Sequence, residues 1–384
     1  MKVLFVSSWF PNRVTPLNGD FVERHALAVS QVCKTAVLHV ITDSKVHGRF
    51  LEIHEIQKNS LFEVIIYIRR ISIGPESAAR LITHLLYALG YFIGYWIVRR
   101  EIGPPDIIHA NIIVPVSKVA LLFHRLLNIP YIISEHWTIY LTDERSKLLH
   151  GYAKPVTKAF ALVPVTRNLQ DSLISFGYRG RYYVVPNVVD TGIFKPSGKR
   201  TGSEKKILHV SSMKEDHKNI SGIIRAIRML RDKREDFTFT FVGNATAQQK
   251  EMVTVAGLTD CIIMAGEVEH RKVADYMRQS DMLVMFSNVE NLPCVILEAL
   301  ACGLPVLSTR VGGISEWLND QNGILIDRGD ENALYQGMNY LLDHSHEYSS
   351  QLLHEYAVKY FSPGVIANRF LAIYNEALNT NNKG

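Results

Sequence analysis

Cysteine is scarce in this chain and is not arranged for disulfide or zinc chemistry. The 384 residues contain four cysteines, with no Cys-x-x-Cys pair and no histidine at the offsets of a metal site: Cys33, Cys261, Cys294 and Cys302. We therefore expect neither a disulfide framework nor a structural zinc. Unpaired thiols are typical of a protein that is kept in a reducing cytoplasm.

The sequence also lacks a secretory signal and any low-complexity tract. Met1–Phe10 runs directly into an apolar strand pattern, with no basic segment before it and no small-residue cleavage site. We therefore expect the mature protein to begin at Met1. With 47% hydrophobic and 21% charged residues, the chain can bury a large core. Its length suits two domains of roughly 150–200 residues each, which would allow a cleft between them.

Positive charge is in excess, but in one half of the chain only. Met1–Lys195 holds 22 lysines and arginines against 14 acidic residues, a net charge of +8, whereas the rest has a net charge of −3. A basic first half predicts an anionic partner, for which the candidates are a membrane surface, a phosphorylated acceptor and nucleic acid. Nucleic acid is the weakest of the three, because no recognition motif or basic and aromatic array accompanies the charge.

Short runs rich in Val and Ile alternate with amphipathic stretches along the chain, which is typical of βα units on a parallel sheet. In the first half the predicted strands are Lys2–Ser8, Thr35–Thr42, Glu63–Arg69, Asp106–Asn111, Tyr131–His136, Ala161–Thr166 and Tyr182–Pro186. In the second half they are Ile207–Ser211, Phe237–Gly243, Cys261–Ala265, Met282–Ser287, Pro305–Thr309 and Gly323–Ile326. Between them, the polar stretch Lys195–Lys206 predicts a linker. The sequence thus predicts two doubly wound α/β domains in tandem, residues 1–195 and 196–361, which bind ligands beyond the carboxyl ends of their strands.

The segment Leu81–Val98 is nearly all apolar or aromatic, is flanked by arginines and approaches the length of a membrane span. We do not expect a span, because Thr83 and His84 interrupt it and the strand Asp106–Asn111 must rejoin the sheet of the preceding strand. A core helix is the first interpretation. A helix lying on a membrane surface is the second, since aromatic residues with arginine suit an interfacial contact.

The most informative stretch is Ser287–Gly303, which reads SNVENLPCVILEALACG and begins where a predicted strand ends. Pro293 suits the first turn of a helix, where its missing N–H costs nothing. The free N–H groups of that turn and the helix dipole form an anion site suited to a diphosphate. Glu290 precedes the helix and Glu298 lies within it, so both carboxylates can face one ligand. The alternative is a solvated pair of glutamates, but Glu298 lies in an apolar run where an unpaired carboxylate would be costly to bury.

The spacing Glu290-x7-Glu298 followed by AlaCysGlyLeuProVal resembles the signature of glycosyltransferase family 4. The resemblance covers nearly the whole chain: Val311–Glu316, Pro186–Asp190, Asp106–Asn111 and the segment around Gly243 also fit, in the family's order. It implies an α/β GT-B fold, in which two Rossmann-like domains with doubly wound parallel sheets face a central cleft. It also implies that the final helix, Ser362–Leu378, crosses back, so that residues 362–384 rejoin the first domain.

The resemblance implies a set of donor contacts in the second domain. Glu290 would bind the transferred sugar, Glu298 the nucleotide ribose, and the backbone of Asn291 and Leu292 the sugar and phosphates. Lys218 matches the family lysine on the diphosphate, where its charge stabilises the leaving nucleotide. Gly243 and Ser212 are further candidates for donor contacts; Ser212 stands where an arginine is usual, and Lys214 is a candidate substitute for that arginine. The alternative for Lys218 is an exposed loop lysine.

In the first domain the resemblance singles out Gly19 and His136. Gly19 matches a glycine turn near the donor phosphate, where only glycine lets the backbone approach closely; from sequence alone, a turn glycine without a ligand is equally compatible. His136 follows a predicted strand and matches the family histidine near the anomeric carbon. His109 lies deeper in its strand, and we expect it either to be structural or to support the residues that contact the substrate.

The resemblance further implies a retaining transferase that moves a sugar from a UDP- or GDP-sugar to an acceptor, with His136, Glu290 and Lys218 at the reaction centre. No cofactor is expected, and no metal either, because the chain lacks the Asp-x-Asp usual in metal-dependent transferases. We expect a glycan or lipid-linked acceptor, and a cytoplasmic protein in peripheral contact with the inner face of the cell membrane. Closure of the cleft would bring His136 towards Glu290.

Rival functions share parts of this pattern. A sugar-nucleotide epimerase or a phosphorylase could use the same two-domain plan. A protein that binds a sugar nucleotide but does not transfer the sugar is a further alternative, because Ser212 stands where an arginine is usual. A nicotinamide dehydrogenase is not expected, because no Gly-x-Gly-x-x-Gly follows Lys2–Ser8.

Overall fold

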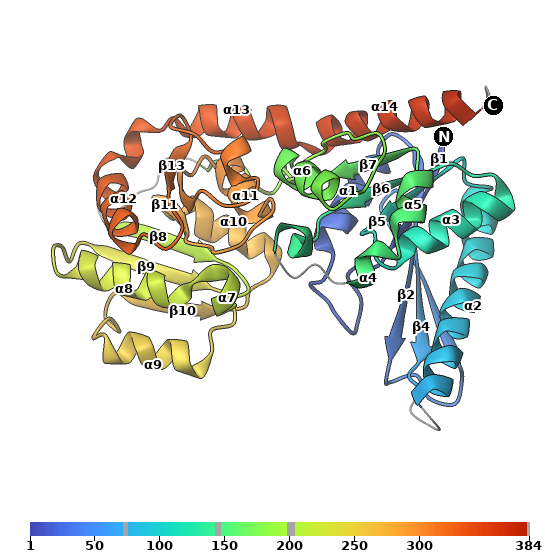
Figure 1. Ribbon diagram of the computed structural model, residues 1–384. Coiled ribbons are helices and arrows are strands. Elements are labelled where there is room, and N and C mark those ends of the chain that lie inside the picture. Colours follow the sequence, from blue (N-terminus) through green and yellow to red (C-terminus); the bar gives the residue numbers. More distant parts are fainter. Residues whose placement is uncertain (72–75, 143–146, 198–203, 382–384) are drawn as a thin grey trace. The chain divides into compact units, whose positions relative to one another are not determined.

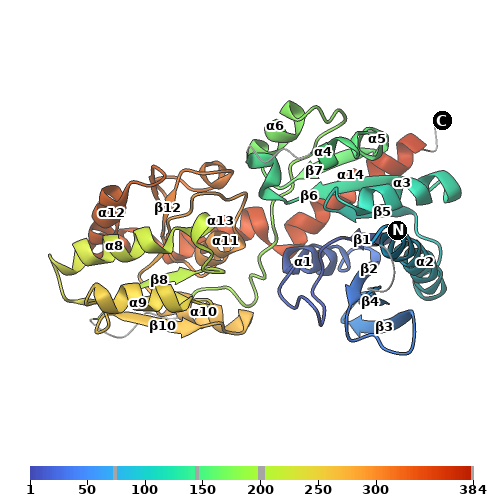
Figure 2. The same cartoon turned by 60° about the horizontal axis from the view of Figure 1, so that its bottom comes forward.

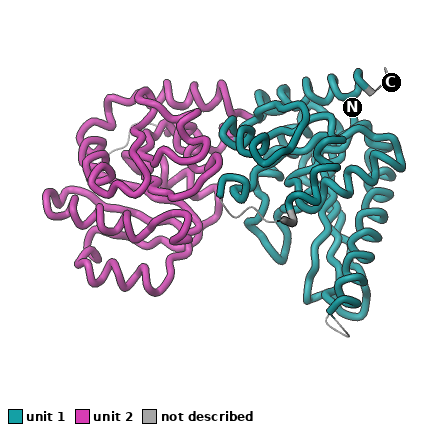
Figure 3. Tube along the Cα trace, in the orientation of Figure 1, with its two compact units in different colours: residues 1–188, 363–384 teal, residues 189–362 magenta. Residues whose placement is uncertain are grey.

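The computed structural model describes residues 1–71, 76–142, 147–197 and 204–381. The chain forms two compact units, which Figure 3 colours separately: unit 1 comprises Met1–Val188 with Pro363–Gly384, and unit 2 comprises Val189–Ser362. The boundary that we predicted at Lys195 therefore falls within unit 2. Part of the predicted linker Lys195–Lys206, residues 198–203, lies outside the described residues.

The described residues of unit 1 form a seven-stranded sheet in the order β3-β4-β2-β1-β5-β6-β7. Its strands are β1 (Lys2–Ser7), β2 (Lys34–Asp43), β3 (Leu51–Lys58), β4 (Leu61–Arg69), β5 (Ile107–Asn111), β6 (Tyr131–Glu135) and β7 (Ala161–Pro164). The strands run parallel except β3, which pairs antiparallel with β4. Buried runs such as the fully buried β5 and β6 explain the continuous apolar pattern, because both faces of a parallel sheet are covered.

In unit 1 the sequence analysis missed one strand and predicted one that does not form. We did not predict β3, a largely exposed edge strand with polar residues at most positions, so it has no apolar run to detect. Figure 2 shows it at the edge of the sheet beside β4. Conversely, Tyr182–Pro186 is not a strand and makes a single bridge, Leu162 with Tyr182. The chain runs along β7 here and is joined to it by three backbone hydrogen bonds, but Pro164 lacks the N–H that a continuous ladder would need at its position.

Helices cover both faces of the unit 1 sheet. They are α1 (Asp20–Val29), α2 (Glu76–Ile102), α3 (Val116–Leu127), α4 (Lys147–His150), α5 (Ala153–Lys158), α6 (Arg167–Ser175) and α14 (Pro363–Asn381), with the 3₁₀ turn η1 (Thr138–Leu141). Helix α14 packs on α1. It contributes Ile366, Phe370 and Tyr374 to the same core cluster as Val3 and Phe5 of β1.

Helix α2 packs along β2 and β4, as Figure 1 shows, and presents two different faces. Gly90 and Gly94 allow the close approach, since a Cβ on Gly94 would lie 2.2 Å from a Leu38 methyl carbon. Among the described residues α2 is the one helix long and apolar enough to cross a membrane, with a mean hydropathy of 1.6, and 33% of its apolar window is buried. The expectation of a core helix is thus correct for one face only.

The described residues of unit 2 form a six-stranded parallel sheet in the order β10-β9-β8-β11-β12-β13. Its strands are β8 (Lys205–Val210), β9 (Phe237–Val242), β10 (Ile262–Gly266), β11 (Met282–Met285), β12 (Val306–Thr309) and β13 (Gly323–Ile326). Each lies where the sequence predicted a strand.

The helices of unit 2 alternate with these strands. They are α7 (Glu215–Lys218), α8 (Ile220–Arg231), α9 (Ala247–Val255), α10 (His270–Arg278), α11 (Cys294–Ala301), α12 (Glu331–His344) and α13 (Ser350–Phe361), with the 3₁₀ turns η2 (Ile314–Glu316) and η3 (Ser345–Glu347). Helix α8 buries the apolar face that its 3.6-residue period predicts: Ile220, Ile223, Ile224, Ile227 and Leu230.

Candidate active site

Both sheets have a switch point, at which the strand order reverses. In unit 2 the chain leaves β8 towards β9 and returns to pair β11 with β8, and in unit 1 it leaves β1 towards β2 and returns to pair β5 with β1. At a switch point the two loops that follow the carboxyl ends of adjacent strands diverge, so a crevice opens between them. The predicted site residues are distributed around these two places.

In unit 2 the loop after β11 carries Glu290, Asn291 and Leu292, all of which are buried. This loop rests on the turn at Gly312 and Gly313. The Asn291 carbonyl accepts a hydrogen bond of 2.9 Å from the Gly313 N–H. Gly312 has φ +57°, and a Cβ there would lie 1.9 Å from the Glu290 carbonyl oxygen. Gly312 and Gly313 therefore set how closely the loop after β11 packs against the turn after β12.

Lys218 and Glu290 meet at the unit 2 switch point. Lys218 ends α7, in the loop region after β8, and its ammonium donates to the Glu290 carboxylate. The Ser287 hydroxyl donates to the same carboxylate oxygen over 2.8 Å. Both charged side chains are largely shielded from solvent. The structure thus brings together two residues that the sequence placed 72 positions apart.

Helix α11 begins directly after this loop. Pro293 is its N-cap, with φ −68° and ψ 122°, and no acidic residue occupies the first turn. The partial positive charge of a helix start therefore lies next to the segment that carries Glu290. This arrangement can bind a negatively charged group such as a diphosphate.

Glu298 lies in the middle of α11 and is buried. Its carboxylate lies 2.8 Å from Nε2 of His270, the first residue of α10. The His270 ring lies 4.9 Å from that of Phe194. The alternative of a solvated surface glutamate is therefore wrong. Sequence reasoning missed His270, because nothing in its local pattern indicates a contact with a helix 28 residues away.

Ser212 and Gly243 follow β8 and β9. Ser212 is exposed at the carboxyl end of β8, and Lys214, its candidate substitute, is exposed as well. Gly243 has φ +143°, and a Cβ there would lie 2.1 Å from the Ser211 carbonyl oxygen. Close packing of the two loops thus already explains the glycine at 243.

In unit 1, Gly19 follows β1 and precedes α1. It has φ +81°, and a Cβ would lie 2.3 Å from the Trp9 carbonyl group. The loop therefore folds over the backbone of Trp9 and needs glycine for that reason alone. The role near a phosphate remains a prediction.

His136 follows β6 and is buried against aromatic rings. Its ring lies 4.4 Å from that of Phe21 and 5.4 Å from that of His25. Burial holds the pKa of His136 well below its ordinary value, so the ring is neutral at neutral pH. A neutral imidazole here can donate or accept a hydrogen bond without carrying a charge.

Glu135, which sequence reasoning did not single out, holds His136 in place. Its carboxylate accepts hydrogen bonds of 2.8 Å from the backbone N–H groups of Ile113, His136 and Trp137. It thereby ties the loop after β5 to the loop after β6. Burial raises the pKa of Glu135 to about 7 even though these three bonds favour the charged form.

His109 is held inside unit 1 by two hydroxyl groups. It is buried in β5, and its ring nitrogens lie 2.7 Å from the hydroxyls of Tyr374 and Ser134. No group of three His, Cys, Asp or Glu side chains that could hold a metal occurs among the described residues. That His136 approaches Glu290 stays a prediction, because the two residues belong to different units.

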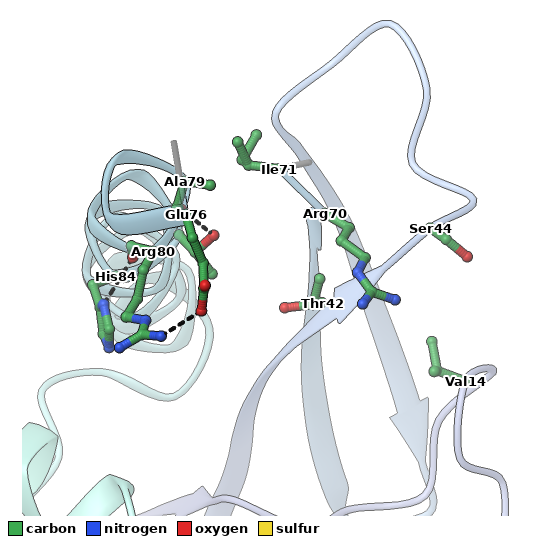
Figure 4. A pocket seen from close by; sticks show the side chains of 10 residues that line it. Val14, Thr42, Ser44, Arg70, Ile71, Glu76, Ala79, Arg80 and His84 are labelled. Atoms are coloured by element: carbon green, nitrogen blue, oxygen red, sulfur yellow. Dashed lines mark hydrogen bonds and ion pairs between the residues drawn. The ribbon is translucent and has the colours of Figure 1, made fainter. Parts of the chain in front are cut away.

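A cavity of about 530 Å³ opens in unit 1 near the carboxyl ends of β2 and β4. Figure 4 shows Arg80 and His84 on the α2 side and Thr42 and Arg70 on the side of the sheet. Arg80 pairs with Glu76, while Arg70 makes no ion pair with any described residue. The cavity thus offers cationic and hydroxyl groups at the same edge of the sheet as Gly19 and His136.

Two doubly wound α/β units, each with candidate residues at its switch point, define a protein of the GT-B class. Residues 49–192 match the family model described as Glycosyltransferase Family 4, and residues 204–344 match the model described as Glycosyl transferases group 1. The chain belongs to the glycosyltransferases that carry these two domains.

Relatives and solved structures agree with this assignment. The chain is 26% identical over 338 residues to an uncharacterized glycosyltransferase of Methanocaldococcus jannaschii, covering 87% of this chain and 86% of that protein. It is 27% identical over 247 residues to the teichuronic acid biosynthesis glycosyltransferase TuaC of Bacillus subtilis, covering 61% and 60%. Sucrose-phosphate synthase of Thermosynechococcus elongatus shares the fold with a TM-score of 0.76 at 16% identity, covering 99% of this chain and all of that one. Anabaena HepE, crystallised with UDP and glucose, gives a TM-score of 0.73 at 17% identity, covering 98% and 100%.

Proposed function

We propose that this glycosyltransferase transfers a sugar, with retention of configuration, from a nucleoside diphosphate sugar to an acceptor in surface polysaccharide or glycolipid synthesis. The observation that carries the proposal is the Lys218–Glu290 ion pair at the unit 2 switch point, directly before the start of α11. It provides a cation, a carboxylate and a helix N-terminus in one place. Those are the groups needed to hold a diphosphate and the hydroxyls of a sugar.

The chemistry assigned to these residues is mainly electrostatic. Lys218 and the first turn of α11 stabilise the negative charge that develops on the leaving diphosphate. Glu290 accepts hydrogen bonds from sugar hydroxyls, and His136, held by Glu135, orients the sugar near its anomeric carbon. The acceptor hydroxyl attacks from the side of the leaving group, whose oxygen takes its proton. Positioning then supplies much of the rate, and no carboxylate nucleophile is required.

We further propose a reaction without a metal ion or cofactor. A lysine and a helix N-terminus can supply the positive charge that a divalent ion supplies elsewhere, and the chain has no Asp-x-Asp sequence. Activity retained in excess chelator is the expected result. Complete loss in chelator, restored by a divalent ion, would contradict this part.

UDP-sugars are the first candidates for the donor and GDP-sugars the second. HepE binds UDP and glucose, and Staphylococcus aureus TarM has been crystallised with UDP. Names of relatives refer to teichuronic acid and amylovoran biosynthesis, which supports an acceptor among surface glycans or their lipid-linked precursors. We place the reaction in the cytoplasm at the inner face of the cell membrane, since the first half of the chain is basic.

Two steps test the proposed function. Thermal shift with UDP-, GDP- and ADP-sugars should show stabilisation by one nucleotide class. The radiolabelled form of that donor should then transfer its sugar to a lipid and glycan extract of the source cells, and the product should keep the anomeric configuration of the donor. An inverted product would contradict retention.

One observation keeps a non-catalytic sugar-nucleotide-binding protein as the second candidate. Ser212 stands where the family usually has an arginine, and its side chain is exposed at the carboxyl end of β8. Donor binding without any acceptor-dependent product would favour that candidate. Interconversion of the donor sugar without acceptor would instead indicate an epimerase.

A further inference from the structure

Helix α2 carries an exposed apolar stripe. Leu81, Leu85, Leu89, Phe92 and Trp96 are each 45–61% exposed. Their spacing of three and four residues places them on one side of the helix, over a length of about 22 Å. Single exposed apolar residues need no explanation, but an aligned row of five large ones marks an interaction surface.

The stripe cannot be turned towards the core. The opposite side of α2 buries Leu86, Tyr91, Tyr95 and Val98, and the helix packs along β2 and β4. The helix approaches the sheet closely at Gly94, where even a methyl group would clash with Leu38. A helix held in this way on a sheet is not surrounded by lipid on all sides, so it cannot serve as a membrane span.

Cations accompany the stripe at both ends. Arg80, which pairs with Glu76, precedes it, and Arg99 and Arg100 follow it, of which Arg100 pairs with Glu55. The Arg99 guanidinium lies 5.0 Å from the centre of the Trp96 ring and makes no ion pair with any described residue. Tryptophan and arginine beside an aliphatic row are typical of a helix that lies in a membrane interface.

We propose that the exposed face of α2 docks on an anionic lipid bilayer. Its five apolar side chains enter the boundary between head groups and acyl chains, and Arg99, beside Trp96, contacts lipid phosphates. The net charge of +8 on residues 1–195 favours an anionic surface and opposes a second copy of the same unit. The first two turns of α2 also line the unit 1 cavity, so docking would hold that cavity near the lipid surface.

This inference rests on the proposed function, which locates the enzyme at the membrane. It adds the surface of the protein that binds the membrane and the kind of lipid that this surface binds. The inference and the proposed function can fail separately. Binding of vesicles needs neither donor nor turnover, and transfer to an acceptor in detergent needs no bilayer.

Co-sedimentation of the full chain with vesicles tests the proposal. Vesicles of phosphatidylcholine with phosphatidylglycerol should bind the protein, phosphatidylcholine alone should bind it at least several-fold more weakly, and added salt should weaken the binding. Trp96 is a built-in reporter: its fluorescence should shift to shorter wavelength on binding, and Trp96→Phe should remove most of the shift. Failure of the wild-type chain to bind anionic vesicles would overturn the proposal.

A double variant locates the surface. Leu85→Ser with Phe92→Ser removes apolar area without adding negative charge, and we expect the affinity for anionic vesicles to fall about tenfold or more. Val255→Ser with Leu352→Ser changes two exposed apolar residues of unit 2 and should leave binding unchanged. Unchanged circular dichroism and thermal midpoint establish that both double variants are folded.

Two other outcomes contradict the inference. If the Leu85→Ser, Phe92→Ser variant binds vesicles as the wild type does, another surface carries the contact. If the wild type forms a dimer that this variant dissociates, and neither binds vesicles, the face belongs to a second copy of the chain.

Discussion

Lys218 is the residue whose replacement should have the largest specific effect. Its ammonium neutralises the largely buried Glu290 and, on our proposal, the leaving diphosphate. We predict that Lys218→Ala lowers kcat by about 100-fold or more, because a positive charge in a shielded site is worth several kcal/mol to a developing anion. Steady-state kinetics with the donor identified by thermal shift measures this effect.

Lys250→Ala, at an exposed lysine of α9, is the control for that variant and should change kcat less than about threefold. Lys214, which is exposed at the other end of α7, is tested separately as the candidate substitute for the missing arginine. If Lys214→Ala proves as damaging as Lys218→Ala, Lys214 has taken over the part of the missing arginine at position 212. Full activity in Lys218→Ala would remove the basis of the proposed site.

We predict that replacing Arg70 weakens the binding of the acceptor and leaves the binding of the donor unchanged. Arg70 lines the unit 1 cavity without an ion pair among the described residues, beside Thr42 and opposite Arg80. If the cavity holds an anionic group of the acceptor, Arg70→Ala should raise the acceptor KM about tenfold and leave the donor KM unchanged. Arg271→Ala, at an exposed arginine of α10 in unit 2, is the control. An equal rise in both Michaelis constants would argue against an acceptor site.

At the scale of elements, the glycine turn after β12 supports the loop after β11. We predict that Gly312→Ala lowers both stability and activity, because its Cβ would lie 1.9 Å from the Glu290 carbonyl oxygen and the loop must move. Gly329→Ala is a close control, since Gly329 also has positive φ, +80°, but has no atom within 4 Å of a Cβ. It should cost about 1 kcal/mol through backbone strain alone and leave kcat unchanged. Thermal unfolding and kinetics on both variants separate strain from loop displacement.

The strands and helices that the sequence predicted correctly are those whose own residues carry a recognisable pattern. The strand before Ser287 and the helix after Pro293 follow from an apolar run and a helix-start proline, and their place in the sheet follows from the βα pattern. Strand β3 escaped prediction because it is an exposed edge, and Tyr182–Pro186 was wrongly predicted because its apolar residues pack beside β7 without completing a ladder. A local pattern of apolar residues indicates that a segment is buried, but a buried segment does not have to pair as a strand.

Within the candidate site, the same distinction separates what could be predicted from what could not. Glu290, Lys218 and Glu298 stand in recognisable motifs, and the structure supplies their partners. His270 and Glu135 were missed, since each acts through a contact that only the tertiary fold creates: one with a carboxylate on another helix, the other with three backbone N–H groups of two loops. A sequence motif identifies which side chain can act in the site. The contacts that surround this side chain come from residues that belong to no motif.

For the molecule as a whole, buried histidines should make unit 1 sensitive to acid. Burial lowers the pKa of His25 and His39 to about 4 and holds those of His109 and His136 well below the ordinary value. A depressed pKa means that the unfolded chain binds protons which the folded chain excludes, so stability falls as the pH falls below about 6.5. Each such histidine is worth on the order of 1–2 kcal/mol between pH 6.5 and 5.

Two glutamates of the same unit act in the opposite direction. Burial raises the pKa of Glu63 and Glu135 to about 7, so the folded chain takes up protons between about pH 7 and 4.5, which stabilises it on acidification. Four histidines against two glutamates leave a net loss of stability between pH 6.5 and 5. In unit 2, His209 is the one described histidine with a pKa lowered in this way, to about 4, so that unit should be less sensitive.

Urea unfolding of the full chain at pH 7.5, 6.5, 5.5 and 5 tests this balance. We expect the free energy of unfolding of unit 1, followed by hydrogen exchange of its amides, to decrease below pH 6.5 more steeply than that of unit 2. His39→Gln should reduce that slope by up to about 1.4 kcal/mol per pH unit, the value for one proton. His346→Gln, at an exposed histidine of unit 2, should leave it unchanged. A unit 1 that gains stability between pH 6.5 and 5 would mean that the two glutamates dominate, and that the buried histidines accept protons without unfolding.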